Sequence, residues 1–332
     1  MPANIPSIRL TLEDGTDLAE KLGPRFLSAT LSEKTGEESD QLDIVLHNHD
    51  GRLASPAAGV YLRLAMGWAQ GSDVRVGLVD KGRFKVDEVS EEGPPDTVTI
   101  RCRAANLTGK YRTRQNKGWK NTTLGAILTE IARDNGRAAA IHPDLASKPI
   151  AAMEQPAKSD MAFVRDLGRR FDAMATEKDK TLIFMPIGAA TTAAGTVIPA
   201  LTFTRQHGNR WSFRHAQRNE HDGAEAQWHD KASGKRKTVK TGGTNRHRIK
   251  RTFHNQQDAE HATAAKASSQ KRGAFEFEYD LALGDPAINP NQKATLQGWN
   301  DKIDAIRWLV KEATHKMDNS GLTTSLRFES AG

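Results

Sequence analysis

Residues 82–102 read GRFKVDEVSEEGPPDTVTIRC, and this stretch decides the fold class. Phe84 and Val86 alternate with polar residues, and every second residue of TVTIRC is apolar, ending at Cys102. Alternation with a period of two is typical of half-buried β-strands, because successive side chains point to opposite faces. The Gly-Pro-Pro connector between the two segments cannot itself continue a hydrogen-bond ladder. The pattern predicts two strands on one core, with Cys102 as a small buried side chain rather than a reactive thiol.

The first hundred residues contain more segments of the same kind. Two of them alternate at Ile8, Leu10 and Leu12 and at Leu42, Ile44 and Leu46. The first segment is followed by Asp14-Gly15, a dipeptide that favours the type I′ turn of a hairpin. We therefore expect an opening hairpin and a first barrel-like β domain at residues 1–108.

After Tyr111 the apolar period changes to that of a helix. The apolar stripe has i, i+3, i+4 and i+7 spacing and consists of Leu124, Ile127, Leu128 and Ile131. We expect Asn121 or Thr122 to cap this helix and Gly136 to follow its end. The residues of the stripe should form the core of an α/β insert domain at residues 109–190.

A second amphipathic helix is predicted in SDMAFVRDLGRRFDAM, with Ser159 or Asp160 as its cap. Its apolar stripe consists of Phe163, Val164, Leu167 and Phe171. The strand TLIFMPI follows it. These elements complete the insert.

The last third returns to strands. GAEAQWHD and KRKTVKTG should pair as a hairpin across residues 231–234, and an alanine-rich helix is expected at about 256–271, with Asn255 as its cap. We assign residues 191–332 to a second barrel-like β domain with this helix embedded in it. The predicted fold class is mainly β with an α+β insert: two barrel-like β domains, a small α/β domain and an embedded helix.

The composition fits a soluble globular protein. Of 332 residues, 37% are hydrophobic and 27% charged, and a single cysteine excludes an internal disulfide framework. The N-terminus carries no secretory signal pattern. The stretch Thr181–Thr204 has no charge, but its prolines, glycines and threonines favour strand, turn and strand over a membrane span. We expect assembly in a reducing cytoplasm.

The net charge of +7 resides in one segment. Residues 205–251 hold 13 Lys or Arg against four Asp or Glu, and residues 231–251 hold nine basic residues and no acidic one. Such a block fits nucleic acid, an acidic protein partner or a solvated, poorly ordered loop. We take an interface with an acidic protein as the working hypothesis, and its candidate residues are Lys235, Arg236, Lys237, Lys240, Arg246 and Arg248.

The sequence lacks the motifs of common enzymes. Neither GxSxG nor HExxH nor a phosphate-binding glycine loop is present. Paired carboxylates at Asp40 and Asp43 or at Glu276 and Glu278 are better explained as solvated strand faces than as a glycosidase pair. Six histidines are spaced too irregularly to favour zinc: His207, His215, His221, His229, His247 and His254. We predict no catalytic residues, no metal and no cofactor.

The order of several segments resembles the phage late control protein D family of contractile-tail hub proteins, which are similar to the N-terminal hub part of type VI secretion spike proteins. The matching segments include SDQLDIVLHNHDGRLASPAAGVYLRLAMGW, GRFKVDEVSEEGPPDTVTIRCRAA, TTLGAILTEIA, GTVIPALTFTR, AEAQWHDKASGKRKTVK and THKMDNSGLTTSLRFE. A further match is the Q-x-x-x-S-D-x-x-F-x-x-x-L pattern formed by Gln155, Ser159, Asp160, Phe163 and Leu167. Together these segments extend through nearly the whole chain.

The resemblance implies a structural hub rather than an enzyme. Similar proteins form a homotrimeric ring in the baseplate of a phage tail or a phage-like bacteriocin, where two barrels per chain adapt a threefold spike to a sixfold tube. The implied partners are a second and third copy, the spike, the tube or tube-initiator protein and the tape measure protein. A DNA-binding late-gene regulator and a cell-wall hydrolase remain the alternatives. The implied location is the virion tail, assembled in the host cytoplasm.

Overall fold

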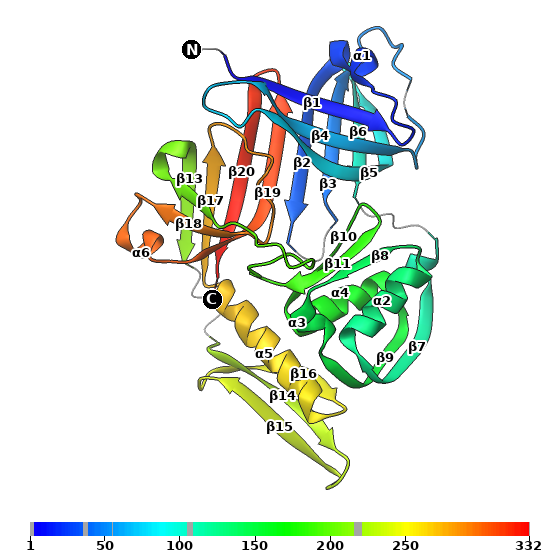
Figure 1. Ribbon diagram of the computed structural model, residues 1–332, viewed down its shortest axis with the longest axis vertical. Helices are drawn as coiled ribbons and strands as arrows, with labels where there is room; N and C mark the ends of the chain where they lie inside the picture. Colours follow the sequence, from blue (N-terminus) through cyan, green and yellow to red (C-terminus); the bar gives the residue numbers. More distant parts are fainter. Residues whose placement is uncertain (1–2, 36–38, 55, 105–108, 216–220, 332) are drawn as a thin grey trace.

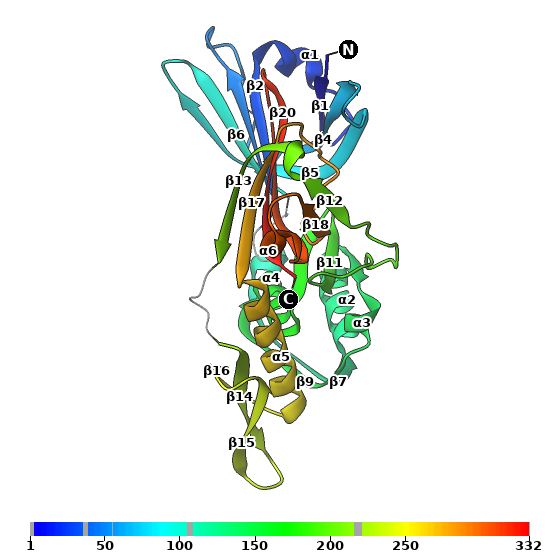
Figure 2. The same ribbon diagram turned by 90° about the vertical axis from the view of Figure 1, so that its left-hand side faces the viewer.

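The computed structural model describes residues 3–35, 39–54, 56–104, 109–215 and 221–331. Most of its elements are strands, which confirms the predicted mainly β class with an α/β insert. Figure 1 shows a large sheet, an insert beside its lower end and a smaller unit built on α5 that projects farther down. The molecule is therefore elongated, as the turned view in Figure 2 also shows.

The large sheet has 12 strands and joins the two ends of the chain. Its main path has the order β1-β4-β5-β6-β3-β2-β19-β20-β17-β13, and β18, which pairs with β12, attaches to β19. The strands are β1 (Ile5–Leu12), β2 (Phe26–Lys34), β3 (Gln41–His47), β4 (Tyr61–Gln70), β5 (Gly77–Glu92), β6 (Thr97–Arg103), β12 (Leu201–Thr204), β13 (Gly208–His215), β17 (Phe275–Leu281), β18 (Lys293–Gln297), β19 (Trp308–Asp318) and β20 (Gly321–Ser330). Short helices α1 (Ala19–Leu22) and α6 (Asp301–Asp304) lie in its connections.

The sheet has two hydrophobic cores, one in each half. Strands β1 to β6 surround the first core and β13 with β17 to β20 the second. Strands β19 and β20 contribute to both, since Met317 and Leu322 pack in the first core while Val310 and Phe328 pack in the second. The halves meet where β19 pairs antiparallel with β2, from Glu312 opposite Lys34 onward. A continuous ladder thus fixes their relative orientation.

The insert contains two small sheets and three helices. Its elements are β7 (Arg114–Thr123), α2 (Leu124–Asp134), β8 (Ala138–Ile141), α3 (Pro143–Ala146), β9 (Pro149–Ser159), α4 (Asp160–Phe171), β10 (Ala173–Lys178) and β11 (Thr181–Pro186). Strands β7 and β9 form a ribbon, and β10, β11 and β8 form a three-stranded sheet. The predicted stripe of α2, including Leu128, is fully buried in a core shared with α4. The two predicted helices and the strand TLIFMPI are present, whereas β7, β8, α3, β9 and β10 were not predicted.

A third unit lies within residues 221–272, a range that was predicted to be part of the second barrel-like β domain. Strands β14 (Gly223–Asp230), β15 (Lys235–Gly242) and β16 (Arg246–Phe253) form their own sheet in the order β15-β14-β16. Helix α5 (Gln256–Arg272) is capped by Asn255, as predicted, and packs on this sheet. Its core is small and rich in alanine. The boundaries predicted for the three domains stay predictions.

The interpretation of residues 231–251 as a solvated, poorly ordered loop is wrong. Only residues 231–234 and 243–245 lie outside strands in this segment. The hairpin of β14 and β15 was predicted, but β16 was not. Lysine and arginine reach solvent easily from a strand, so a run of charges does not by itself exclude a ladder.

Two local predictions need correction. The turn at Asp14-Gly15 exists, with Gly15 at φ 87°, but it leads through a single bridge from Thr11 to Asp17 into helix α1 rather than into a hairpin strand. The partner of β1 is β4, far along the chain. Helix α2 is capped by the side chain of Thr123 rather than by Asn121 or Thr122. For α4, Ser159 is the cap.

The uncharged stretch forms strands, as predicted. It contains β11 and β12, and between them Thr191 and Val197 form a bridge. Among the residues described, no helix is both long and apolar enough to cross a bilayer. Cys102 is fully buried on β6, and burial raises the pKa of its thiol to about 12. The interpretation of Cys102 as a core residue is therefore confirmed.

Candidate interaction surface

The six basic residues chosen from the sequence lie on two strands of the β14–β16 sheet. Strand β15 carries four of them and β16 carries Arg246 and Arg248. One face of this sheet is covered by α5, since Thr241 on β15 hydrogen-bonds Thr263 on the helix over 3.0 Å. Side chains alternate between the faces of a strand, so the six residues divide into two groups.

The first group shares the face of Thr241. Lys237 lies opposite Trp228, with its ammonium 5.6 Å from the ring centre, and forms an ion pair of 2.6 Å with Asp230. Lys235 lies opposite Asp230 in the register. The Lys237 ammonium is the main cause that holds the pKa of Asp230 below its usual range. Lys237 therefore stabilises the hairpin itself, and Lys235 lies on the same face.

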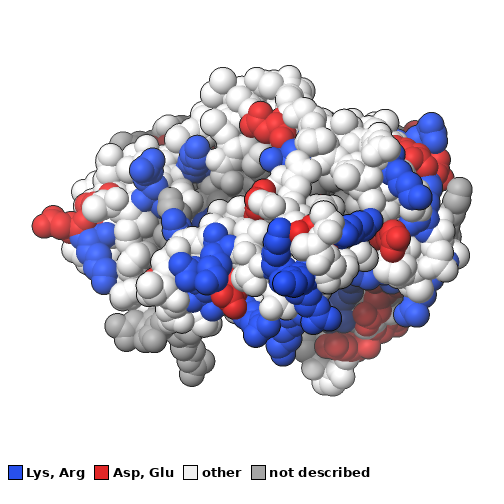
Figure 3. Space-filling model, turned by 90° about the horizontal axis from the view of Figure 1, so that it is seen from below, with Lys and Arg blue, Asp and Glu red and all other residues white. Residues whose placement is uncertain are grey.

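The second group lies on the outer face, away from α5. Arg236 and Lys240 project from β15, and Arg248 lies two strands away. All three are exposed, while Arg246 is half-buried. The partner of both Lys240 and Arg248 in the register is Glu225 on the central strand. Figure 3, which views this end of the molecule, shows Lys and Arg side chains spread over it. The outer face is an open basic sheet surface, which suits an acidic partner.

The Q-x-x-x-S-D pattern has a structural explanation in the insert. Asp160 opens α4 and is buried, and its carboxylate accepts hydrogen bonds from the amides of Gln155 (2.9 Å), Asn135 (2.7 Å) and Gln115. Its neighbour Ser159 caps the helix. Three amides from β7, β9 and the end of α2 thus converge on one carboxylate. The pattern therefore fixes α4 in the insert.

A buried group of charged side chains lies where the insert meets both halves of the sheet. Glu33 on β2 contacts Lys81 on β5 (2.5 Å), Lys178 on β10 (2.6 Å) and His315 on β19 (3.4 Å). Lys178 also pairs with Asp40 (3.3 Å). We call these five residues the junction cluster. Because its members come from three parts of the chain, the cluster holds those parts in one arrangement.

Burial and pairing act against each other in the junction cluster. Burial raises the pKa of Glu33, but His315, Lys81 and Lys178 outweigh burial and lower it. Burial lowers the pKa of His315 and that of Lys81, whereas Asp40 and Glu33 more than offset burial at Lys178 and raise its pKa. For Asp40 burial dominates and raises the pKa. At neutral pH the cluster therefore contains an ionised Glu33 beside a neutral imidazole.

The carboxylates considered for catalysis have other partners. Asp40 is buried in the junction cluster, so its interpretation as part of a solvated face is wrong, and Asp43 accepts hydrogen bonds from Gln41. Glu278 pairs with Arg327, and Glu276 lies 3.6 Å from the ammonium of Lys311. Among the described residues, no three histidines, cysteines or carboxylates are placed to hold a metal ion. Of the six histidines, His221 and His247 come together, 5.4 Å between ring centres.

Comparison with known proteins identifies the family. The model of the family "Phage tail baseplate hub (GPD)" matches residues 45–321. The chain belongs to this family of baseplate hubs. It is 31% identical to the probable baseplate hub protein of Escherichia phage 186, over 98% of this chain and 92% of that protein. The corresponding protein of Escherichia phage P2 is 32% identical, over 95% and 91%. The chain is thus a component of a phage tail, and its family is a structural one.

Solved structures share the fold of this hub. A 43 kDa tail protein of prophage MuSo2 from Shewanella oneidensis has a TM-score of 0.67 at 13% identity and covers 98% of both chains. A tail protein from Neisseria meningitidis MC58 has a TM-score of 0.69 at 11% identity, with 99% of this chain and 97% of that chain covered. The type VI secretion component c3393 of E. coli scores 0.57 at 12% identity, over 93% of this chain and 74% of that one. The expected likeness to secretion spike proteins is confirmed for the fold.

Sequence reasoning missed the junction cluster of the hub. Glu33, Lys81 and His315 each stand in a strand of alternating polar and apolar residues, where a charged side chain ordinarily faces solvent. Lys81 is 2% exposed and Glu33 1%. The three positions lie far apart in the chain, and only the folded sheet brings them together: β2 pairs with β19, while Lys81 reaches Glu33 from β5. No signal within a single segment indicates such a cluster.

Proposed function

We propose that this hub forms a homotrimeric ring that adapts a threefold spike to a sixfold tail tube. The observation that carries the proposal is the pair of β units, each with its own core, joined by the ladder between β2 and β19. Three chains with two such units each would present six. The fixed ladder supports this role, because sixfold spacing requires both units of a chain to keep one relative orientation.

The two ends of the large sheet suit contacts between copies. The outermost strands of its path are β1 and β13. An open edge presents unpaired backbone groups and is usually protected or paired. Each edge also carries an exposed apolar side chain, Ile5 (46% exposed) on β1 and Trp211 (37%) on β13. A head-to-tail contact between these edges would close a ring if the rotation per subunit is 120°.

Further exposed apolar residues lie near the β1 edge. Val76 bridges to Trp68, Pro6 pairs with Trp68, and the indole of Trp68 donates to the carbonyl of Gly284 over 2.8 Å. Their neighbours Ile5 and Leu283 are exposed, as is Val76. Segments from three parts of the chain thus gather apolar side chains around one tryptophan. Such a patch supports an interface at this end of the sheet.

The trimer is tested with a charge placed on the β13 edge. We expect the wild-type chain to give the mass of three copies in size-exclusion chromatography with light scattering, and Trp211→Lys to give the mass of one. Val197→Lys is the matched control, because Val197 is 72% exposed and lies in the connection between β11 and β12, away from the β13 edge. It should leave the trimer intact. A wild-type chain that stays monomeric or dimeric, alone and with its spike, would refute the ring.

We propose that the outer face of the β14–β16 sheet contacts an acidic surface of the spike, the tube or the tube-initiator protein. The support is the exposure of Arg236, Lys240 and Arg248 on one uncovered face. Exposed ion pairs add modest affinity, so the face would mainly speed and orient assembly. Arg246 lies at its margin, and Lys235 and Lys237 belong to the α5 side.

Charge reversal tests this face. The triple variant Arg236→Glu, Lys240→Glu, Arg248→Glu should pull down less spike or tube protein while its oligomeric mass stays unchanged. A control triple variant elsewhere on the surface, Arg52→Glu, Lys120→Glu and Lys293→Glu, should pull down normally. If the first variant keeps both protein partners and instead loses tight duplex DNA binding, with a steep dependence on salt, the face is a nucleic-acid site.

The remaining roles follow from the same proposal. The hub would act without a cofactor or catalytic residues, meet the tape measure protein inside the tail and assemble in the host cytoplasm. Three of the carboxylates weighed for catalysis support this, since Asp40, Glu276 and Glu278 are engaged with basic side chains. Release of sugar from purified peptidoglycan by the wild type, abolished in Glu276→Gln, would contradict it.

A further inference from the structure

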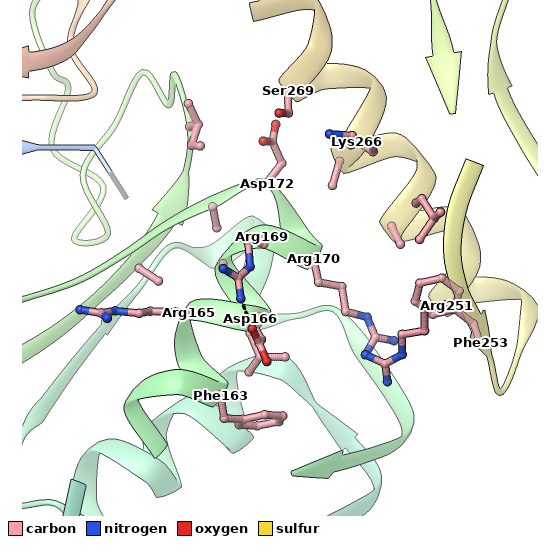
Figure 4. A pocket seen from close by; sticks show the side chains of 18 of the residues that line it. Phe163, Arg165, Asp166, Arg169, Arg170, Asp172, Arg251, Phe253, Lys266 and Ser269 are labelled. Carbon is pink, nitrogen blue, oxygen red and sulfur yellow. Dashed lines mark hydrogen bonds and ion pairs between the residues drawn. The ribbon is translucent and has the colours of Figure 1, made fainter. Parts of the chain in front are cut away.

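A groove separates the insert from the α5 unit. It has a volume of about 670 Å³ and is lined by α4, β9 and β10 on one side and by α5 and β16 on the other. Figure 4 shows Arg165, Arg169 and Arg170 along α4, with Arg251 and Lys266 across from them. The volume falls in the range of ligand sites. None of the surfaces considered above includes this groove.

The lining of the groove is strongly basic. Seven Lys or Arg residues line it against three Asp or Glu residues. Two of the three carboxylates are already paired, Asp166 with Lys158 and Arg169, and Asp172 with Arg272. The groove therefore holds more positive charge than its own acids neutralise.

Several cations remain available to a ligand. Arg165, Arg251 and Lys266 have no carboxylate partner in the parts of the chain that the structure describes. Arg170 pairs with Asp258, but its Nε is buried and has no hydrogen-bond partner among the described residues. Figure 4 shows Arg170 and Arg251 reaching toward the same part of the groove from opposite walls. Like charges brought together in this way favour an anion between them.

The walls decide what kind of anion fits. Pro156, Ile187 and Ile249, which are exposed or half-buried, provide an apolar floor beside the cations. A single nucleic-acid strand would need exposed aromatic rings on which its bases stack, but Phe163 is 4% exposed and Phe253 5%. A peptide that alternates carboxylates with apolar side chains meets both the cations and the floor.

We propose that this groove binds an acidic peptide segment of another tail protein. Carboxylates of the segment contact Arg251, Lys266 and the unpaired Nε of Arg170. The apolar side chains of the segment lie on the apolar floor of the groove. His247, which also lines the groove, reports occupancy, because burial and then Lys266 lower the pKa of its ring in the free protein. A bound carboxylate raises that pKa.

The probe is a fluorescein-labelled hexapeptide of alternating glutamate and leucine, titrated by fluorescence anisotropy into the full chain. Wild type should bind it, and the double variant Arg251→Glu, Lys266→Glu should bind at least tenfold more weakly. The control double variant Lys231→Glu, Lys271→Glu makes the same charge change at exposed positions outside the groove and should alter the affinity less than twofold. Thermal unfolding of all variants establishes that each is folded. In NMR titrations the peptide should raise the pKa of His247.

Four results would overturn the proposal. The first is no binding to the wild type, and the second is equal binding to the wild type and the double variant. The third is full displacement of the peptide by millimolar inorganic phosphate with the same shift of the His247 pKa, which means a small-anion site. The fourth is tighter binding of a dodecamer of deoxythymidine that the double variant loses, which means a nucleic-acid groove. Because the assay measures the isolated chain, a monomer that binds the peptide would refute the trimer and leave the groove site standing.

Discussion

Glu33 illustrates how a single side chain can hold distant segments together. It is 1% exposed and contacts two ammonium groups and one imidazole from three other strands. A buried carboxylate is costly unless its partners compensate it, and each partner here depends on it in turn. Lys81 also ties the cluster to the connection between β17 and β18, because its ammonium donates to the carbonyl of Pro286 over 2.8 Å.

Loss of the Lys81 charge should be severe. We expect Lys81→Met to lower the free energy of unfolding by about 3–5 kcal/mol, because it leaves Glu33 buried beside fewer cations. Lys85→Met, a change of the same type at a half-buried position on the same strand, should cost less than about 1 kcal/mol. Urea unfolding followed by circular dichroism measures both. Equal losses in the two variants would mean that the cluster contributes no specific stability.

The junction cluster also predicts a dependence on pH. His315 has a folded pKa below its ordinary 6.5, so the stability it contributes is present above pH 6.5 and is lost as the pH falls. Glu33, lowered from 4.5, acts in the same direction at lower pH, whereas Asp40, whose pKa is raised, partly opposes both. Stability should therefore decline from about pH 6.5 downward.

The variant His315→Gln isolates the upper part of that decline. Its stability between pH 5 and 7 should change less than that of the wild type, since glutamine does not titrate. His254→Gln, at an exposed histidine, is the control and should keep the wild-type slope. Denaturant midpoints measured at half-unit pH steps give both slopes. Parallel curves for wild type and His315→Gln would contradict the assignment.

Among the elements, α2 has the clearest sequence signal and the clearest test. Leu128 is fully buried in the insert core, so Leu128→Ala should lower the free energy of unfolding by about 2–5 kcal/mol. Thr129→Ala removes a comparable group from the exposed face of the same helix and should cost less than about 0.5 kcal/mol. Denaturant melts of the two variants make the comparison. A loss below about 0.5 kcal/mol for Leu128→Ala would mean that this face is not core.

The helices were predictable because their information is local. Leu128 and its stripe repeat at the helical period, and Ser159 and Asn255 cap α4 and α5 as the sequence indicates. Strand β16 was not predictable, because its partner in the register is the nonadjacent β14, and its charged residues look like a loop. The prediction of an opening hairpin was wrong for the same reason. Asp14-Gly15 specifies a turn, but the partner of β1 is set by tertiary packing.

Only part of the candidate site could be predicted from the sequence. The sequence found the basic strands, but it could not separate Lys237, which pairs with Asp230, from Arg248, which faces outward. That distinction needs the position of α5. The groove was missed altogether, since Arg170, Arg251 and Lys266 come from three elements that only the folded chain brings together.

At the scale of the whole molecule, the free energy of local opening should differ between its parts. The ladder of β2 and β19 joins two large cores, whereas the core of the α5 unit consists of Ala226, Phe253, Ala259 and Ala262. Little apolar area means a low free energy of local opening. Hydrogen exchange with mass spectrometry should show peptides of β14 to β16 exchanging at least tenfold faster than peptides of β2 and β19. Equal protection throughout would mean that the chain unfolds as one cooperative body.

The central position of β19 has a consequence for synthesis in the cell. Strand β2 ends at Lys34, yet its neighbour in the sheet begins at Trp308, about 270 residues later. At roughly 5–20 residues per second, a ribosome needs about 15–55 s to supply that neighbour. Throughout this interval the nascent chain exposes an unpaired strand edge. A product that terminates before residue 308 never covers it, so truncated chains are marked for chaperones and proteases before they can enter a tail.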